Sequence, residues 1–473
     1  GNQRGEGLLI SGFNNISNTT NKFVTNTGEQ VQRNIGYFGE AKVDYKEMMY
    51  LGATARRDEV STLPKANRAF DYFSTNASFV FGDLIDKDRA VLSLGKLRAS
   101  WAEVGKIPPY GIGRYSRPET PFNGIGGISI GSIGSDPNIR PEIVTTLELG
   151  TDLKFFNNRL RLEYTYFDRK SDDQIIAVPV SQISGLTSIW SNAGSLKTVG
   201  HELTVAGDIL KSSSLKWTAT ANFTAYDTEV TALPFENVVF MDSFQGVISQ
   251  VKVGDAAGSL YGYTWTQVDG QRLIGADGLP VLKKTAKGDF EYSKVANAFP
   301  DWVATLNNTL TYKNFNLSFL FEYKEGGSAF DSGQRNGLRN GVLKITEERN
   351  IQKVLDGVKS DGAGGYIKND IPAIIDANSY YRNENYNRAS EILVQDASWL
   401  KLRNVSLSYN LPSELLRKLN IATASFTLSG SNFLLWTPFR GFDPEGSQFS
   451  SGSNVYGFTG LNVPLTQSYS FGV

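Results

Sequence analysis

Apolar and polar residues alternate with a period of two in many segments of this chain. Between Leu147 and Phe155, leucine, threonine and phenylalanine occupy every second position, and Glu148, Asp152 and Lys154 lie among the residues between them. A period of two puts successive side chains on opposite faces of a β-strand. The pattern therefore predicts about thirteen strands. They cover residues 35–45, 49–58, 70–81, 92–104, 147–155, 160–167, 200–209, 215–224, 302–312, 315–323, 397–409, 422–432 and 465–473.

The alternation changes phase near Arg403. Leucines occupy the even positions 400 and 402, whereas apolar residues occupy the odd positions from 405 to 409. One extra residue in one strand of a pair, a β-bulge, produces such a change. We expect a bulge at this place.

The connections between the predicted strands alternate between short and long. Short connections occupy 46–48, 157–159, 211–214 and 313–314, and long ones occupy 105–143, 171–199, 225–301, 324–396 and 433–464. Outer-membrane barrels have this asymmetry, because their periplasmic turns are short and their extracellular loops are long. Charge on one face does not separate a barrel from a soluble sandwich. The loop lengths favour an all-β fold, a transmembrane antiparallel β-barrel.

The direction of the strands limits how this barrel is completed. With the short turns in the periplasm, the first and the last predicted strand both run towards the periplasm, so the number of strands is odd. Closed bacterial barrels have an even number, and an unpaired edge in lipid is costly. We expect residues 35–473 to be the C-terminal part of a larger barrel, and residues 1–34 to be an extracellular loop segment.

Composition narrows the chemistry. The 473 residues include 47 Lys plus Arg and 48 Asp plus Glu, a formal net charge of −1 that argues against nucleic-acid binding. The chain has no Cys, and His201 is its one histidine, so we expect no metal site and no cofactor. The sequence contains no run of about 18 or more apolar residues, so it predicts no transmembrane helix. A mean hydropathy of −0.26 fits strands that hide apolar residues in alternate positions.

A few local motifs have ordinary structural interpretations. The glycine-rich stretch at 124–134 lacks the spacing of a phosphate loop and is interpreted as a surface loop. Asp269-Gly270 and Asp277-Gly278 predict tight hairpin turns rather than a calcium site. Two segments have a helical pattern: residues 413–419, directly after Pro412, and residues 343–358.

Longer segments resemble a known family. They read IGYFGEAKVDYKEMMY at 35–50, LGKLRASWAEVG at 94–105, PNIRPEIVTTLELGTDLKFFNNRLRLEYTYFDRKSDD at 137–173 and ASWLKLRNVSLSYNLPSELLRKLNIATASFTLSGSNFLLWTPFRGFDPE at 397–445. With shorter matches at 192–203, 258–265 and 312–327, they cover nearly the whole chain from residue 35 onward. Together they resemble the barrel of SusC/RagA-like TonB-dependent outer-membrane transporters.

The resemblance implies a multi-pass outer-membrane protein whose barrel has about 22 strands around a plug. Such transporters import oligosaccharides or peptides with a SusD-like surface lipoprotein and are energised by TonB. Measured against that family pattern, we expect the plug, the TonB box and about nine strands to lie outside these 473 residues. We therefore expect TonB to act through the missing N-terminal part, and outer-membrane lipids to surround the apolar face.

Two sets of residues are candidates for function. The first is expected to line the lumen with charge of mixed sign: Glu40, Lys42, Asp44, Arg56, Glu148, Asp152, Lys154, Arg161 and Glu163. The second is expected to contact substrate from the outer loops, because aromatic rings stack on sugars and amides bind hydroxyls. It consists of Tyr110, Tyr115, Trp190, Asn192, Tyr380, Tyr381 and Trp436. For all of these residues, pairing on the barrel wall or packing within the loops is the alternative.

Three functions compete. The first is TonB-dependent import of oligosaccharide or peptide nutrients. The second is a barrel of the same family that serves as a scaffold in a surface or secretion assembly. The third, a barrel enzyme, would depend on His201 beside Glu202, but we interpret His201 as a solvated residue at the rim of a strand that begins at Gly200. We expect no enzymatic activity.

Overall fold

The computed structural model describes most of the chain. The described residues are 2–8, 11, 19–26, 31–86, 88, 91–108, 110–112, 131–244, 246–418, 420–449, 453–460 and 462–473. Tyr115, Leu419 and positions 124–130 of the glycine-rich stretch lie outside them.

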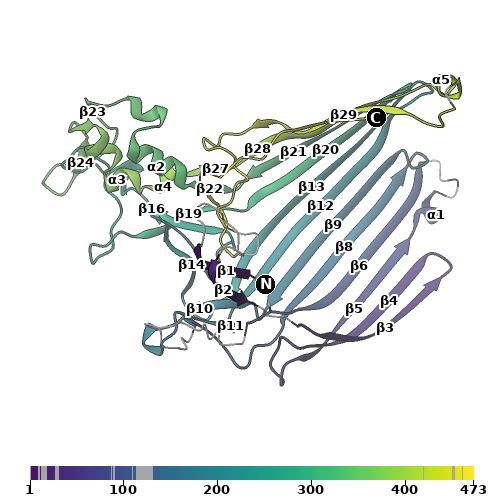
Figure 1. The fold of residues 1–473 in the computed structure, drawn as a ribbon, viewed down its shortest axis with the longest axis horizontal. Coiled ribbons are helices and arrows are strands. Elements are labelled where there is room, and N and C mark those ends of the chain that lie inside the picture. Colours follow the sequence, from purple (N-terminus) through teal and green to yellow (C-terminus); the bar gives the residue numbers. More distant parts are fainter. Residues whose placement is uncertain are drawn as a thin grey trace.

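One curved antiparallel sheet of thirteen strands dominates the fold, and its strands follow one another in chain order (Figure 1). Its two edges are β3 and β31, so the sheet is open. The strands are β3 (Asn34–Tyr45), β4 (Met49–Val60), β5 (Ala69–Val80), β6 (Leu92–Lys106), β8 (Glu142–Phe155), β9 (Leu160–Asp172), β12 (Ser195–Lys211), β13 (Leu215–Ala232), β20 (Pro300–Tyr312), β21 (Phe315–Gly326), β28 (Trp399–Asn410), β29 (Ser425–Trp436) and β31 (Ser468–Gly472). The thirteen strands predicted from alternation, and the all-β fold, are confirmed.

Strand ends differ from the prediction where the backbone pairs beyond the alternating segment. The pairing of β12 with β13 continues outward to Ser195 and Ala232. The alternation had placed these strands at 200–209 and 215–224. Backbone hydrogen bonds do not depend on the side-chain pattern, so a hairpin can extend through a segment of mixed polarity.

Long loops gather at one end of the main sheet, and shorter connections lie at the other end (Figure 1). The tightest turns use left-handed backbone, as at Lys46 with φ 51° and Glu47 with φ 54°. The expected alternation of lengths is not strict. Residues 61–68 form a short connection at the loop end, and residues 411–424 form a longer one at the turn end because it contains a helix.

The loops contain small sheets that the alternation did not reveal. They consist of β1 (Asn2–Leu8) with β2 (Thr19–Asn26); β7 (Ile133–Ser135), β10 (Ile175–Pro179) and β11 (Ser188–Asn192); β14 (Asn237–Phe244), β15 (Val247–Lys252), β16 (Ser259–Tyr263) and β19 (Tyr292–Asn297); β17 (Gln267–Val268) with β18 (Gln271–Arg272); β22 (Ser328–Asp331), β27 (Val394–Asp396) and β30 (Phe458–Thr459); β23 (Ile351–Val354) with β26 (Pro372–Ile375); and β24 (Val358–Ser360) with β25 (Tyr366–Lys368). The β17–β18 hairpin turns at Asp269-Gly270, where both residues have positive φ, as predicted.

The helices are short. They are α1 (Gly82–Ile85), α2 (Ser332–Asn340), α3 (Glu384–Asn387), α4 (Ser390–Leu393), α5 (Ser413–Lys418), and single turns η2 (Gln182–Ser184), η3 (Lys344–Glu347) and η4 (Ala377–Tyr381). Over the described residues, no helix is long and apolar enough to span a membrane. The helix predicted after Pro412 is confirmed as α5.

The helix predicted at 343–358 is wrong. Only the single turn η3 forms there, and strand β23 follows it. Between them, Asn350 has φ 62°, a left-handed conformation that a right-handed helix cannot contain. The backbone of β23 pairs with β26 instead.

The main hydrophobic core lies in the loops and not in the main sheet. The three long loops at 233–299, 327–398 and 437–467, called the loop body here, share this core. Phe330 and Phe458 are buried with their ring centroids 5.6 Å apart, and β22 pairs with β30 beside them. Segments far apart in the sequence therefore fold into one unit at the loop end.

Candidate functional site

The nine residues expected to line the lumen lie on one face of the main sheet, called the charged face here. In an antiparallel pair, residues directly opposite each other are on the same face. The register places Arg56 opposite Phe38, Asp152 opposite Glu163, and Lys154 opposite Arg161. Followed from β3 to β9, it puts all nine on that face: Glu40, Lys42, Asp44, Arg56, Glu148, Asp152, Lys154, Arg161 and Glu163.

Charged side chains on this face form ion pairs, some between neighbouring strands and some within one strand. Arg98 Nε lies 3.3 Å from Asp152 Oδ1 across β6 and β8. Lys42 Nζ lies 2.8 Å from Glu40 within β3. These pairs are partly or largely exposed, and each contributes little to stability. Together they form a solvent-exposed surface that carries both positive and negative charges.

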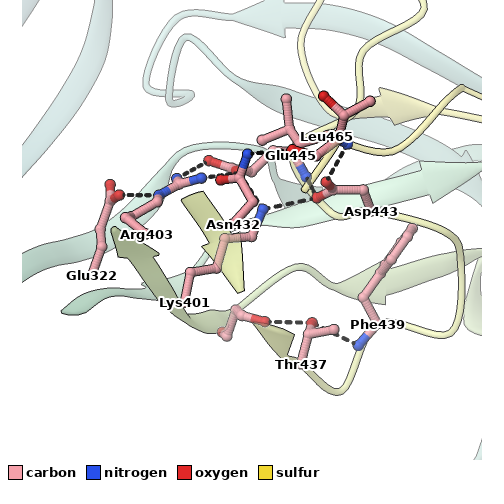
Figure 2. Close-up of polar contacts among 11 residues, drawn as sticks. Glu322, Lys401, Arg403, Asn432, Thr437, Phe439, Asp443, Glu445 and Leu465 are labelled. Carbon is pink, nitrogen blue, oxygen red and sulfur yellow. Dashed lines mark hydrogen bonds and ion pairs between the residues drawn. The ribbon is translucent and has the colours of Figure 1, made fainter. Parts of the chain in front are cut away.

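A denser cluster of five charges ties the last long loop to the charged face (Figure 2). We call it the β28 ion cluster. It consists of Lys401 and Arg403 on β28, Glu322 on β21, and Asp443 and Glu445 on the loop 437–467. Lys401 Nζ lies 3.0 Å from Asp443 and also contacts Glu445. The Lys401 and Asp443 side chains are only 5% and 8% exposed.

Arg403 joins the cluster from the bulge predicted in the sequence. The register of β28 shifts against both neighbours between Leu402 and Asn404, which confirms the bulge. Arg403 therefore has no opposite residue, while Lys401 lies opposite Glu322. The Arg403 guanidinium donates to Glu322, and its Nη1 donates to Glu445 at 2.8 Å.

On the loop side, Asp443 holds two parts of the chain. Its Oδ1 accepts the backbone N–H of Glu445 at 3.0 Å, and its Oδ2 accepts that of Leu465 at 3.4 Å. Nearer β29, Thr437 Oγ1 donates to the carbonyl of Ser398 at 2.7 Å. Thr437, Asp443 and Glu445 thus fasten the first part of the loop to β28 and its flank, and Asp443 joins this part to Leu465 near the end of the loop (Figure 2).

A buried indole lies under the two cations of the cluster. Trp399 is 3% exposed, with Lys401 Nζ at 5.0 Å and Arg403 Cζ at 4.7 Å from its ring centroid. Cations in this position are attracted by the ring electrons, more strongly when they are desolvated. The contacts hold both cations towards the loop carboxylates.

The two loop carboxylates are stabilised in their ionised form. Burial raises the pKa of Asp443 and of Glu445, but hydrogen bonds and the nearby cations outweigh it. The pKa of Asp443 is lowered by hydrogen bonds from the backbone and from Lys401. The pKa of Glu445 is lowered by hydrogen bonds from Arg403 and Lys401. Both pKa values therefore lie below their ordinary values of 3.8 and 4.5.

Acidification should loosen the loop 437–467. Because the pKa values of Asp443 and Glu445 are lower in the attached loop, their stabilisation is complete above the ordinary values and is lost as the pH falls through the lowered ones. We expect proteolytic cleavage within 437–467 to increase between pH 5 and pH 3. Mass spectrometry of the fragments measures it. In D443N/E445Q the cleavage should no longer depend on pH over this range, and a dependence that persists would contradict the assignment.

Three of the residues expected to contact substrate lie around β11. Asn192 donates to the carbonyls of Arg140 at 2.9 Å and Asp173 at 2.7 Å, so its amide holds the loop backbone. Trp190 is partly buried against a small apolar cluster. Tyr110 lines a nearby pocket.

The other expected contacts are separated from these. Tyr381 is 2% exposed, and its hydroxyl donates to the carbonyls of Ile345 and Glu348 at 2.7 and 2.9 Å, so it stabilises the loop body. Tyr380 packs on Tyr386 with ring centroids 4.1 Å apart, and it lines a pocket. Trp436 lies opposite Leu400, on the apolar face of the sheet.

His201 lies within a strand and not at its beginning, because β12 begins at Ser195. The register places it opposite Tyr166, on the apolar face, and its Nδ1 is 2.8 Å from the Tyr164 hydroxyl. Glu202 lies opposite Thr165, on the charged face. The two side chains therefore point away from each other and do not form an acid–base pair. Among the described residues, no group of three or more His, Cys, Asp or Glu could hold a metal ion.

The β28 ion cluster was missed at the sequence level. Its members come from three segments, and nothing local connects Glu322 with Lys401 or with Asp443. The change of phase at Arg403 and the carboxylates of the segment FDPE at 442–445 were the available signals.

Comparisons with known proteins agree with the fold. The sequence profile of the family described as TonB dependent receptor-like, beta-barrel, matches residues 3–433. Two curated relatives come from Formosa agariphila. TonB-dependent receptor P3 is 26% identical over 471 residues, which cover 91% of this chain and 45% of the relative. TonB-dependent receptor P26 is 27% identical over 498 residues, which cover 98% and 48%.

Solved structures show the same fold. The RagAB peptide transporter is similar with a TM-score of 0.71 and 23% identity, covering 93% of this chain and 47% of that chain. The RagAB peptide importer in its closed-closed state has a TM-score of 0.70 and 22% identity, with 90% and 46% covered. The chain spans about half the length of the curated relatives that it matches.

Proposed function

This chain belongs to the TonB-dependent receptor-like β-barrel family, and from that premise we propose that it forms the C-terminal part of an outer-membrane importer. The imported solutes are oligosaccharide or peptide nutrients. A SusD-like surface lipoprotein covers the loop end, and TonB supplies energy through an N-terminal part that this sequence does not contain. Residues 35–473 belong to the barrel, and residues 1–34 belong to an extracellular loop segment.

One observation carries the proposal: a single sheet has a charged face, an apolar face, and its long loops gathered at one end. Leu149, Leu203 and Phe321 are examples from the apolar face. If the sheet closes with the charged face inward, the apolar face contacts lipid and the lumen is polar, as in outer-membrane barrels. Further strands would pair with the open edges β3 and β31.

The charged face supports passage of polar solutes. Its ion pairs are partly exposed, so water and solute groups can exchange with them at small energetic cost. Of the expected loop contacts, Tyr110 and Tyr380 line pockets and are retained as solute contacts. Tyr381 is not retained as a solute contact because it is buried in the loop body, and Trp436 is not retained because it lies on the apolar face of the sheet.

Exposed apolar side chains on the loop body support a protein partner there. Val342 is 75% exposed and Phe442 is 61% exposed. Exposed apolar groups of this kind occur at protein interfaces. A surface lipoprotein that docks on the loop body would bury them.

A growth experiment with the full-length gene tests import. Deletion of the gene should abolish growth on one class of oligomer, saccharide or peptide, as the sole carbon source, and complementation should restore growth only when TonB is present. Native purification should give a polypeptide about twice as long as this chain, since the chain covers 45% and 48% of its relatives, together with a lipoprotein.

The outcome that contradicts import also defines the alternative. If growth on both classes is unchanged, and the purified barrel carries other proteins over all of its outer loops, the barrel serves as a scaffold in a surface assembly.

A further inference from the structure

A polar pocket of about 370 Å³ lies at the loop end of the sheet, outside the loop body. We call it the mouth pocket. Its lining comes from the connection between β4 and β5, from the segments on either side of residues 113–130, and from Val31 before β3. The residues that matter for its chemistry are Thr62, Lys65, Arg68, Tyr110 and Asp136.

The pocket lies over the charged face of the sheet. Val60, the last residue of β4, is opposite Asn34 and four positions after Arg56, so it belongs to the charged face. Leu63 of the pocket lining packs with Val60 in one apolar cluster, to which Trp190 also contributes. The pocket therefore lies on the side of the sheet that the proposed function assigns to the solute, and not on the side that it assigns to lipid.

Hydrogen bonds fix the walls of the pocket. The backbone N–H of Val60 donates to the carbonyl of Arg68 at 2.9 Å, which closes the connection between β4 and β5. The Asn67 amide donates to the carbonyl of Asn138 at 2.8 Å and so joins this connection to the segment after residue 131. The site is therefore pre-organised, which lowers the entropic cost of binding.

Two polar side-chain atoms of the lining residues have no hydrogen-bond partner. Arg68 Nε and Thr62 Oγ1 are buried and have no hydrogen-bond partner. Buried donors are normally satisfied, so such atoms indicate a missing partner. Lys65 adds a second positive charge. Among the described residues that line the pocket, Asp136 is the one acidic residue, and its carboxylate accepts from the backbone N–H of Asn138 at 2.8 Å and from the Ser191 hydroxyl at 3.3 Å. Its negative charge opposes an anion, but the two cations Lys65 and Arg68 outnumber it.

We propose that the mouth pocket binds an oxyanion group, a carboxylate or a sulfate, carried by the solute that the barrel imports. Arg68 and Lys65 provide the charge, and Thr62 provides a hydroxyl donor. Charge-assisted hydrogen bonds from a guanidinium to such a group are roughly twice as strong as hydrogen bonds between neutral groups. The proposal rests on the proposed function and refines it, because it selects anionic over neutral solutes.

Titration calorimetry on the natively purified full-length protein tests the pocket. The probes are inorganic sulfate and D-glucuronate, with D-glucose as the neutral match of glucuronate. We expect sulfate and glucuronate to bind and K65Q/R68Q to weaken both at least about tenfold, as expected when charge-assisted bonds are lost. R68K, which keeps the charge, should lose less. K368Q, on exposed β25, is the matched control and should bind like the unchanged protein.

Two further probes separate the sources of the group. An N-acetylated tripeptide with a free C-terminal carboxylate and the same peptide as an amide show whether a peptide carboxylate enters the pocket. Tighter binding of the free acid, lost in K65Q/R68Q, identifies a peptide source, whereas a response to glucuronate or sulfate alone identifies an acidic saccharide. Both results support the oxyanion site.

The site is refuted if sulfate and glucuronate bind no better than glucose, or if K65Q/R68Q, folded as judged by its circular dichroism, binds them as well as the unchanged protein. These outcomes differ from failure of the proposed function. If the protein binds the anions but deletion of its gene leaves nutrient uptake unchanged, the oxyanion site stands and the proposed import function is wrong.

Discussion

Replacing Lys401 with methionine should release the loop 437–467 from the sheet. The Lys401 side chain is 5% exposed, and its ammonium contacts both Asp443 and Glu445. Removing one partner from a buried ion pair leaves uncompensated charge and costs about 3–5 kcal/mol. Methionine has similar length and keeps the apolar contacts, so the effect comes from the lost charge. The loop should open at least roughly a hundredfold more often.

Hydrogen exchange and limited proteolysis of the folded protein measure this opening, with the readout confined to peptides from 437–467. The triple variant K401M/D443L/E445Q should recover much of the protection, because it removes Lys401 together with both of its carboxylate partners, while Arg403 keeps its pair with Glu322. Replacing a buried ion pair or triad with uncharged groups is often neutral or stabilising. Lys353→Met is the matched control. Its pair with Glu348 is about half exposed on both sides, at 52% and 51%, so the change should cost less than about 1 kcal/mol. Equal protection in K401M and K353M would show that the cluster does not hold the loop.

Replacing Leu149 with arginine should destabilise the barrel far more than the same change at the neighbouring Glu148. Leu149 lies near the middle of β8 on the apolar face, opposite Ala99 and Tyr166. A lipid-facing arginine at the midplane of the bilayer costs about 2–4 kcal/mol. Glu148 lies on the charged face, where arginine remains in contact with water.

The full-length protein folded into lipid vesicles and unfolded by urea provides the measurement. Leu149→Arg should lower the unfolding midpoint, and Glu148→Arg should change it little. Leu149→Ala separates the loss of apolar surface from the effect of charge. If both arginine variants behaved alike, the two faces would not differ in their surroundings, and the assignment of lipid and lumen faces would be wrong.

The strands and their faces could be predicted because alternation is a local property. Whether Glu148 and Leu149 lie on opposite faces depends only on the two-residue repeat of a strand. The bulge at Arg403 was visible for the same reason. The predicted helix at 343–358 failed because Asn350 takes a left-handed backbone conformation, and helical spacing of apolar residues does not report that.

The candidate sites depended on contacts that no local pattern encodes. Tyr380 and Tyr381 are adjacent in the sequence, yet Tyr380 lines a pocket and Tyr381 holds the interior of the loop body. The difference arises when separate loops pack together, because one packing surface excludes water from only some of the side chains. The mouth pocket likewise needs the connection between β4 and β5 to meet the segment after residue 131.

By itself the sequence determined a β-sheet with one apolar and one charged face, the place of its bulge, and a neutral, cysteine-free composition without a transmembrane helix. The tertiary structure alone decided that Glu322, Lys401 and Asp443 form one cluster, and that Arg68 lies in a pocket with an unused donor. The physical reason is range. Strand formation depends on neighbours two residues apart, whereas ion clusters and pockets depend on segments brought together by burial of apolar side chains in distant loops.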